Sequence, residues 1–473
     1  MGKGRRILQG KPEASKMKRY NKDMLHGPLL GSIISYTIPI ILASVLQLLF
    51  NAADLVVVGR FRGSLSVGAV GATGSLTTLI ISLFIGLSLG AGVNVAHAIG
   101  SRDEGMQHRM VHTALLVAVV GGLLLSAIGI CFAENFLVLM GTPTDILPLS
   151  TIYMRVYFGG MVFTMVYNFS SAILRAAGDT KSPLIYLAIA GVLNVALNVV
   201  FVVLFGMNVE GVALATIISQ ALSAFLVVRA LCRRTDSCRL ELKKIRIYKK
   251  ALIKILTFGI PAGLQSSVFA ISNVLIQSSV NSFGPVFMSG NAAAGNIEGF
   301  VYTSMNAFSQ TSMNYTGQNV GARQYDRVKK ILLICVICAG ITGILLGGAA
   351  YLFAPWLLRI YITDSAQAVA DGILRMSIVC LPYFLCGMMD ATTGSLRGLG
   401  SSMLPMIISV MGACVLRVVW IYTIFQIPQF HSPQGLLISY PISWVLTFGC
   451  QLTAFLIVLR KHIKKHQPQP TEI

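Results

Sequence analysis

The segment LRAAGDTKSP occupies residues 174–183, and a segment of similar pattern, LRGLGSSMLP, occupies residues 396–405. A shift of 222 positions, from Leu174 to Leu396, superposes the Leu-Arg pair, the second glycine of the later segment and the proline. Prolines and glycines that recur in register mark the same bends and close contacts twice. The same shift, or one residue less, aligns Pro39 with Pro261, Asn51 with Asn273, Gly68 with Gly290, Gly100 with Gly321 and Arg102 with Arg323. The chain therefore contains two copies of one structural unit.

The composition of the 473-residue chain indicates a membrane protein, because 55% of the residues are hydrophobic and only 11% are charged. A soluble domain carries about 25% charged residues. Backbone polar groups in lipid must be satisfied internally, so only helices or closed barrels cross a bilayer. The apolar runs are roughly 20 to 30 residues long and show no period-2 alternation, which suits spanning helices of about 20 residues. We expect an all-α bundle.

Apolar runs between polar, glycine or proline breaks predict twelve spans. The predicted spans are Leu30–Val58, Val67–Ile99, His112–Cys131, Leu147–Ile173, Pro183–Phe205, Val212–Leu231, Ala251–Val280, Met288–Val320, Ile331–Ala354, Val369–Leu396, Met403–Phe425 and Gly435–Leu459. The domains that follow are a basic N-terminus (1–28), a six-helix lobe (29–231), a basic linker (232–250), a second six-helix lobe (251–459) and a tail (460–473).

Lysine and arginine give the orientation, because positively charged loops stay on the cytoplasmic side. The stretch from Arg229 to Lys254 alone holds ten of them, and the first 28 residues are also basic and contain no cleavable signal pattern. We expect both termini in the cytoplasm of a multi-pass protein of the plasma (inner) membrane. The formal charge of +20 is then explained by topology, and nucleic acid is not an expected partner.

Six spans per repeat give both halves the same orientation. Such parallel repeats are typical of secondary transporters whose substrate lies between two bundles. The chain contains neither GxxxxGK[ST] nor HExxH, so the sequence does not indicate a P-loop ATPase or a zinc protease. The CxxC of Cys335 and Cys338 lies in one apolar run without a partner pair, so we do not expect a metal or redox site there. We predict a transporter rather than an enzyme.

Several motifs resemble those of the multidrug and toxic compound extrusion family. They are NAADLVVVGRFRG at 51–63, the two segments quoted above, GQNVGAR at 317–323, and YMRV at 153–156 with its echo ILRM at 373–376. The resemblance covers the chain from Leu29 to Leu459. It implies two six-helix lobes around a central cavity, alternating access, and export of amphipathic, often cationic compounds in exchange for Na⁺ or H⁺. No cofactor is implied beyond the coupling ion.

The strongest candidate for ion coupling is Asp54, because a carboxylate inside a membrane bundle is costly and marks a functional site by default. Asn51 lies one turn earlier on the same helix, and Asn194 and Asn198 share a face of the fifth span. Carboxylate, amide and hydroxyl oxygens suit a hard cation such as Na⁺, and a carboxylate alone can carry a proton. The resemblance assigns Asp54, Asn194, Asn198 and Thr216 to the cation or proton site.

One position departs from that family pattern, since many relatives carry an aspartate where this chain has Asn198. The sequence therefore leaves the choice between Na⁺ and H⁺ open. A second interpretation also stays open: the polar groups could form interhelical hydrogen bonds, each contributing roughly 0.6 kcal/mol.

The acids of the second half are Glu298 in the eighth span and Asp390 in the tenth. We expect them, with Gln265 and Asn273, to line the substrate cavity. Two alternatives are a buried pair between one of the acids and an arginine, and an Asp390 that faces the cytoplasmic loop. We interpret Arg155 and Arg375 as structural residues that pair with carbonyls or acids.

The alternative function is a lipid-linked oligosaccharide flippase, since the two families share a superfamily and topology. Flippases tend to have a strongly cationic cavity, and the sequence offers few buried cations, chiefly Arg417. The expected partners are small-molecule substrates and the lipid bilayer. A monomer suffices, because two covalently joined lobes need no second copy to form a cavity.

Overall fold

The computed structural model describes residues 22–363 and 365–466. Of the predicted basic N-terminus (1–28), only residues 22–28 lie within this part of the chain; of the predicted tail (460–473), residues 460–466 lie within it and are helical, and the rest lies outside. Within it, the secondary structure is helical and contains no strand.

The described residues of the first half form seven α-helices, of which α5 and α6 are bent by 49° at Gly160 into one broken span. The elements are α2 (Leu29–Arg62), α3 (Ser64–Gly100), α4 (Glu104–Leu139), α5 (Leu147–Gly159), α6 (Met161–Ala176), α7 (Lys181–Asn198) with the π-helical η1 (Val199–Leu204), and α8 (Val209–Cys232).

Residues of the second half repeat this order after a loop that contains the short η2 (Leu242–Lys244). Its first elements are α9 (Lys249–Asn281), α10 (Pro285–Gly321), α11 (Tyr325–Leu352), α12 (Ala354–Tyr361), α13 (Ala366–Arg375), η3 (Met376–Cys380), η4 (Leu381–Tyr383) and α14 (Phe384–Gly398). The last are α15 (Met403–Ser409), η5 (Val410–Val415), α16 (Leu416–Tyr422), η6 (Ile424–Gln426), α17 (Pro433–Leu437) and α18 (Ser439–His466).

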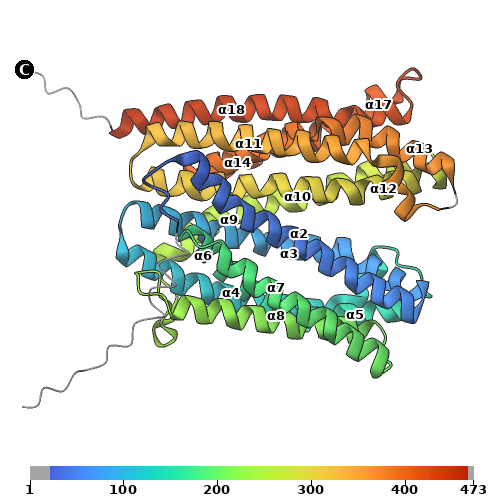
Figure 1. The fold of residues 1–473 in the computed structure, drawn as a ribbon, viewed down its shortest axis with the longest axis horizontal. Coiled ribbons are helices and arrows are strands. Elements are labelled where there is room, and N and C mark those ends of the chain that lie inside the picture. Colours follow the sequence, from blue (N-terminus) through green and yellow to red (C-terminus); the bar gives the residue numbers. More distant parts are fainter. Residues whose placement is uncertain (1–21, 364, 467–473) are drawn as a thin grey trace, which may run out of the picture.

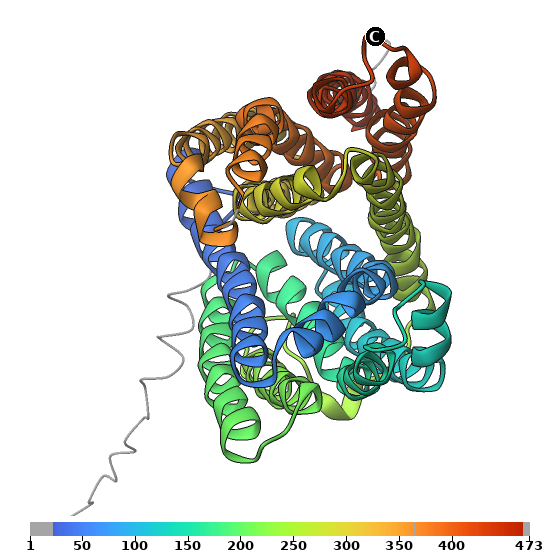
Figure 2. The same cartoon turned by 90° about the vertical axis from the view of Figure 1, so that its right-hand side faces the viewer.

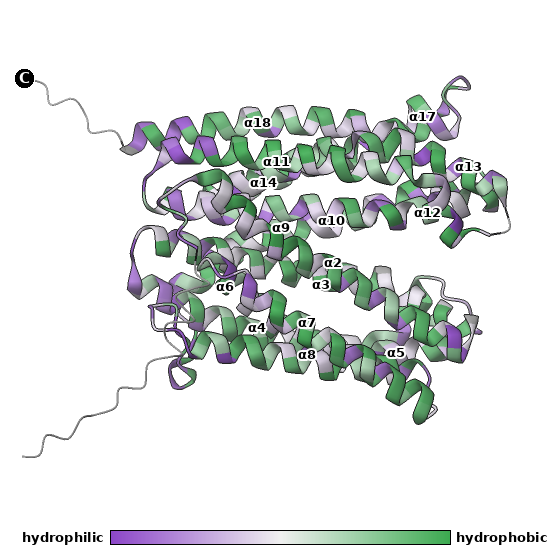
Figure 3. Ribbon diagram, viewed as in Figure 1, coloured by the Kyte–Doolittle hydropathy of each residue, from purple (hydrophilic) through white to green (hydrophobic). Residues whose placement is uncertain are grey.

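The two halves form two lobes that lie side by side along the bundle (Figure 1). Seen end-on in Figure 2, the blue-to-green helices of the first half and the yellow-to-red helices of the second lie in different parts of the bundle, except that the blue α2 reaches the orange helices. Hydrophobic residues cover the long helices, whereas hydrophilic residues gather in the loops at the end where the described chain begins and finishes (Figure 3). This is the outer surface expected of helices that face lipid rather than water.

Ten helices of the described residues are long and apolar enough to cross a membrane, and the bent pair α5–α6 makes eleven. The remaining predicted span corresponds to α10, which is long enough but rich in Asn, Gln, Ser and Thr. Helix α10 is largely buried by its neighbours α3, α11, α13 and α14. Protein rather than lipid covers it, so its polar side chains carry no cost of exposure to hydrocarbon.

The backbone repeats the pattern detected in the sequence. Gly178 and Gly400 both have positive φ, at 91° and 95°, and Arg102 and Arg323 are the two non-glycine residues with positive φ in the described chain, at 55° and 59°. Left-handed backbone is rare outside glycine, so its occurrence at matching positions indicates one structural unit used twice. The predicted two-repeat, all-α fold is confirmed.

The lobes meet in a tight seam near the end where the described chain begins and finishes, which we call the closed end. His97 Nε2 lies 2.6 Å from the carbonyl oxygen of Gly398, and Gln318 Nε2 donates to the carbonyl of Ala176 at 2.7 Å. A Cβ on Gly100 would lie 1.9 Å from the carbonyl oxygen of Gln318. Glycine at position 100 is therefore required for this approach of α3 to α10.

Helix α2 belongs to both lobes. Ile33 and Tyr36, near its start, pack in one apolar cluster with Phe308, Tyr315 and other residues of the second half. The later part of α2 contacts α7 of the first half and carries Asp54. Pro39 lies between the two parts, where it removes a backbone hydrogen bond and favours a bend. A single helix thus connects the N-terminal lobe to the core of its neighbour.

Candidate functional site

The polar residues predicted for the first half converge on one point between α2, α7 and α8. Asn198 Nδ2 donates to Asp54 Oδ1 at 2.5 Å and to Asn194 Oδ1 at 3.3 Å. Thr216 Oγ1 lies 3.4 Å from Asp54 Oδ2 and donates to the Val212 carbonyl at 3.0 Å. Asn194 Nδ2 in turn donates to Thr216 Oγ1 at 3.4 Å. We call Asp54, Asn194, Asn198 and Thr216 the Asp54 network.

The Asp54 network combines one carboxylate with neutral partners. Its hydrogen bonds come from amides and a hydroxyl, and among the described residues none comes from an arginine or a lysine. The side chain of Asn198 is fully buried, and its Oδ1 accepts no hydrogen bond from the described residues. A buried acceptor without a donor calls for an explanation such as an unseen ion or proton donor. The residues present therefore suit a small cation or a proton.

Asn51 does not take part in these hydrogen bonds. Its side chain is exposed, whereas Asp54, three residues later, is half-buried. The spacing of three residues placed both on one side of the helix, but the cluster forms only where α7 and α8 approach. Position 54 faces these helices, and position 51 lies at the margin.

The second group of predicted residues lines a cavity of about 910 Å³, separate from the Asp54 network. Its walls are α9, α10, α14 and α18 of the second lobe, closed on one side by Thr78, Ser82, Ile85 and Leu89 of α3. All four predicted cavity residues contribute to its lining: Gln265, Asn273, Glu298 and Asp390. A cavity of this size has room for a drug-sized molecule.

Glu298 is held by Arg375 in a two-point ion pair. Arg375 Nε and Nη2 donate to the two carboxylate oxygens of Glu298 at 3.1 and 2.7 Å, and Nη1 donates to Asn291 Oδ1 at 2.7 Å. Glu298 is only 3% exposed. Two parallel bonds between planar groups are the strongest form of this contact. Glu298 is therefore neutralised within the protein, which agrees with the alternative of a buried acid–arginine pair.

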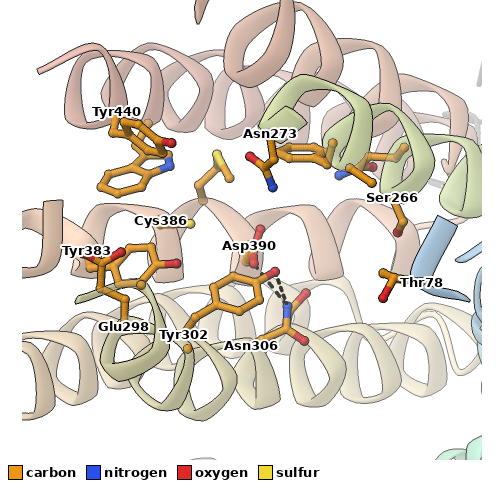
Figure 4. Close-up of a pocket in the computed structure, with 18 of the residues that line it drawn as sticks. Thr78, Ser266, Asn273, Glu298, Tyr302, Asn306, Tyr383, Cys386, Asp390 and Tyr440 are labelled. Atoms are coloured by element: carbon orange, nitrogen blue, oxygen red, sulfur yellow. Dashed lines mark hydrogen bonds between the residues drawn. The ribbon is translucent and has the colours of Figure 1, made fainter. Parts of the chain in front are cut away.

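Asp390 faces the cavity and not a loop. Asn306 Nδ2 donates to Asp390 Oδ2 at 3.1 Å and also lies 3.3 Å from the hydroxyl of Tyr302. Figure 4 shows these three side chains pointing toward one another, with Asn273 on the opposite wall. Seven residues after Asp390, Arg397 reaches across and donates from Nη2 to Gln265 Oε1 at 2.9 Å.

Three arginines line the cavity, one more than the number of acids. The sequence predicts few buried cations and indicates chiefly Arg417, and the structure adds Arg375 and Arg397 to the lining. Arg375 was correctly interpreted as a partner of an acid, and Arg397 was noted only as part of a repeat motif. The signal that was missed is the helical spacing of Asp390 and Arg397, which are seven residues apart and share one face of α14.

Sequence reasoning also missed the aromatic residues of the cavity. Tyr383 stacks on Trp444 with ring centroids 5.1 Å apart, and Tyr302 stacks on Tyr383 at 6.1 Å. Tyr440 meets Trp444 edge-on at 5.9 Å. We call Tyr302, Tyr383, Tyr440 and Trp444 the aromatic wall. Tyr440 and Trp444 are one helical turn apart on α18, but Tyr302 and Tyr383 come from distant parts of the sequence, so no local pattern could have grouped all four.

Two lobes of spanning helices, a seam at one end, a central cavity and a separate half-buried carboxylate between helices define a polytopic transporter. The MatE family matches residues 39–200 and 261–423, one match in each repeat. The chain therefore belongs to this family, that of the multidrug and toxic compound extrusion transporters.

Curated relatives span almost the whole chain. The probable multidrug resistance protein YoeA of Bacillus subtilis (strain 168) is 26% identical over 430 residues, which cover 88% of this chain and 92% of the relative. The probable multidrug resistance protein YpnP of the same organism is 28% identical over 403 residues, covering 85% and 89%. A solved structure described as the outward-facing conformation of a multidrug resistance MATE family transporter has a TM-score of 0.85 at 21% identity, covering 97% and 100%.

Proposed function

We propose that this protein exports amphipathic organic compounds in exchange for a coupling cation, Na⁺ or H⁺, by alternating access of its central cavity. The observation that carries the proposal is Asp54, a membrane-embedded carboxylate whose hydrogen-bond partners are neutral. The names of the two Bacillus relatives, both multidrug resistance proteins, support drug-sized substrates.

Binding of a cation to the Asp54 network changes its charge. An ionised carboxylate inside a membrane bundle carries an energetic cost. A bound Na⁺ or proton cancels that charge, and the unpartnered Oδ1 of Asn198 gains a partner. Because α2 also packs against the second lobe, the occupancy of the network can influence how the lobes meet.

The closed end faces the cytoplasm in this proposal. The basic loop between α8 and α9 lies at that end, where it docks on α4 through Glu241 N to His112 Nε2 at 3.0 Å and Tyr248 N to Thr113 Oγ1 at 3.1 Å. Positively charged loops stay cytoplasmic. The conformation described is then the outward-facing one, and one chain supplies both lobes of the cavity, which makes a monomer the functional unit.

The test is dye efflux from proteoliposomes under an imposed Na⁺ or H⁺ gradient. Two dyes are used, cationic rhodamine 123 and anionic fluorescein, so that the result does not depend on substrate charge. We expect one of the gradients to drive efflux of at least one dye and Asp54→Asn to abolish it. The gradient that works identifies the ion.

The matched control is Asp145→Asn, which makes the same substitution at an exposed residue of the loop between α4 and α5. It should leave efflux unchanged. Gradient-driven efflux that persists in Asp54→Asn would refute coupling at this residue.

A flippase for lipid-linked oligosaccharides is the second candidate, because three arginines line the cavity. The two functions differ in the phenotype of a deletion strain. Sensitivity to dyes with intact surface polysaccharide favours the exporter, and loss of surface polysaccharide favours the flippase.

A further inference from the structure

The charges of the cavity do not cancel. Arg375 and Glu298 neutralise each other through two hydrogen bonds. Asp390 and Arg397 both line the cavity from α14 and have opposite charges. Arg417 is the remaining charged residue of the lining, and the described chain provides it with no salt bridge.

Arg417 is buried and incompletely satisfied. It is 4% exposed, and its Nε donates to Ser443 Oγ at 2.8 Å. Its Nη2 is buried and has no hydrogen-bond partner among the described residues. Arginine stays protonated in proteins, and a buried charge is costly unless it is paired and hydrogen-bonded. Among the described residues, the guanidinium therefore lacks a counter-charge, and its Nη2 lacks an acceptor.

The aromatic wall holds this guanidinium in place. Its Cζ lies 4.2 Å from the ring centroid of Tyr440 and 5.6 Å from that of Trp444. A cation over an aromatic face is attracted by the ring quadrupole. The same wall continues through Tyr383 to Tyr302, which provides flat apolar surface next to the charge.

We propose that the cavity selects amphipathic organic anions: Arg417 binds an acidic group, a carboxylate or an organic phosphate, and the aromatic wall packs against a planar apolar body. An oxyanion would supply the acceptor that Nη2 lacks and the charge that balances the guanidinium. This inference names the substrate class of the proposed exporter and so rests on that function. It replaces the expectation of cationic substrates.

Glu298 and Asp390 do not offer an equal site for a cation. The two oxygens of Glu298 already accept from Arg375, and Asp390 accepts from Asn306. A cationic ligand would have to displace a bidentate arginine or compete with Arg397 nearby on α14. An anion at Arg417 displaces no protein hydrogen bond.

The test measures binding to the purified full-length protein in detergent, followed by fluorescence anisotropy. Fluorescein and rhodamine 123 share a xanthene ring system and differ in charge. We expect wild-type protein to bind fluorescein more tightly. Arg417→Gln should weaken fluorescein binding by about tenfold or more, since a hydrogen bond to a charged group is lost, and should leave rhodamine 123 binding within about twofold.

Two further variants separate charge from folding. Arg417→Lys keeps the positive charge and should retain part of the preference for fluorescein, although it loses the planar fork. Arg359→Gln removes an exposed arginine outside the cavity and should change neither affinity. Size-exclusion profiles and thermal unfolding establish that each variant is folded.

The proposal is overturned if wild-type protein binds rhodamine 123 more tightly than fluorescein, a comparison that needs no variant. Equal weakening of both dyes by Arg417→Gln would also overturn it. The binding measurements test the anion site alone, whereas gradient-driven efflux tests whether the protein is an exporter, so the two proposals can fail separately. If a gradient drives efflux of rhodamine 123 and the protein binds rhodamine 123 more tightly than fluorescein, the exporter function is supported and the anion site is refuted.

Discussion

Gly86 of α3 lies against Gly263 of α9 so closely that a Cβ on Gly86 would lie 2.2 Å from the backbone nitrogen of Gly263 and 2.5 Å from its Cα. One turn further along α3, a Cβ on Gly90 would lie 2.7 Å from the carbonyl oxygen of Ile255. The lobes therefore touch here through backbone, which cannot move aside as a flexible side chain can.

Gly86→Ala should shift the protein away from the conformation described. Overpacking of a tight contact costs about 1 to 3 kcal/mol, which corresponds to roughly a fivefold to 150-fold change in the equilibrium between conformations. Distances between spin labels placed on either side of the closed end would lengthen, and efflux would slow. Gly74→Ala on the same helix meets nothing within 4 Å and should behave as wild type. Unchanged distances in Gly86→Ala would contradict the role of this contact.

The members of the Asp54 network should differ in importance according to their distances. Asn198→Ala removes the 2.5 Å donor to Asp54, whereas Thr216→Val removes a group at 3.4 Å. We expect the apparent affinity for the coupling ion to fall further in Asn198→Ala. Asn51→Ala, one turn before Asp54, is the control and should have little effect because that side chain is exposed. The measurement is the initial rate of efflux as a function of ion concentration. A large effect of Asn51→Ala would mean that Asn51 also belongs to the ion site, contrary to the Asp54 network as defined here.

Glu298 and Arg375 should stabilise the protein only when both are present, so that loss of either one alone is strongly destabilising. Glu298→Gln or Arg375→Gln leaves an uncompensated buried charge, which costs about 3 to 5 kcal/mol. Thermal unfolding of the detergent-purified protein should show a large loss in each single variant and partial recovery in the double variant. The pair of Arg155 and Glu134 is the control: at 3.5 Å, with side chains 48% and 59% exposed, its removal should cost no more than about 1 kcal/mol. Similar losses for both pairs would contradict this ranking.

The basic loop should protect Cys238 from thiol reagents. Burial raises the pKa of this thiol to about 12, and its Sγ donates to Gln107 Oε1 at 3.6 Å. Only the thiolate reacts readily, so a variant that retains Cys238 as its single cysteine should react slowly with maleimide near neutral pH. Denaturation, or Gln107→Ala, should accelerate labelling. Fast labelling of the native protein would show that the loop does not dock as described.

Most of the fold followed from patterns that are local in the sequence. Apolar run lengths determine where helices cross a bilayer, and the shift of 222 residues between LRAAGDTKSP and LRGLGSSMLP indicated the two repeats. Helix α10 could be recognised as a span by its length and its repeat position, although its composition is polar. The burial that makes this composition tolerable depends on the surrounding helices.

Asp54 could be selected from the sequence because a carboxylate inside a span is costly, and the family resemblance added Asn194, Asn198 and Thr216; the structure brings all four together. Asn51 could not be separated from them, because spacing along one helix does not show which neighbours cover each side of it. The pairing of Glu298 with Arg375, 77 residues apart, and the group formed by Arg417, Tyr440 and Trp444 arise only when distant helices pack. The chemistry of a charged group alone shows that its burial is costly. Tertiary structure decides which partner offsets this cost, and it leaves Arg417 without an acidic partner among the described residues.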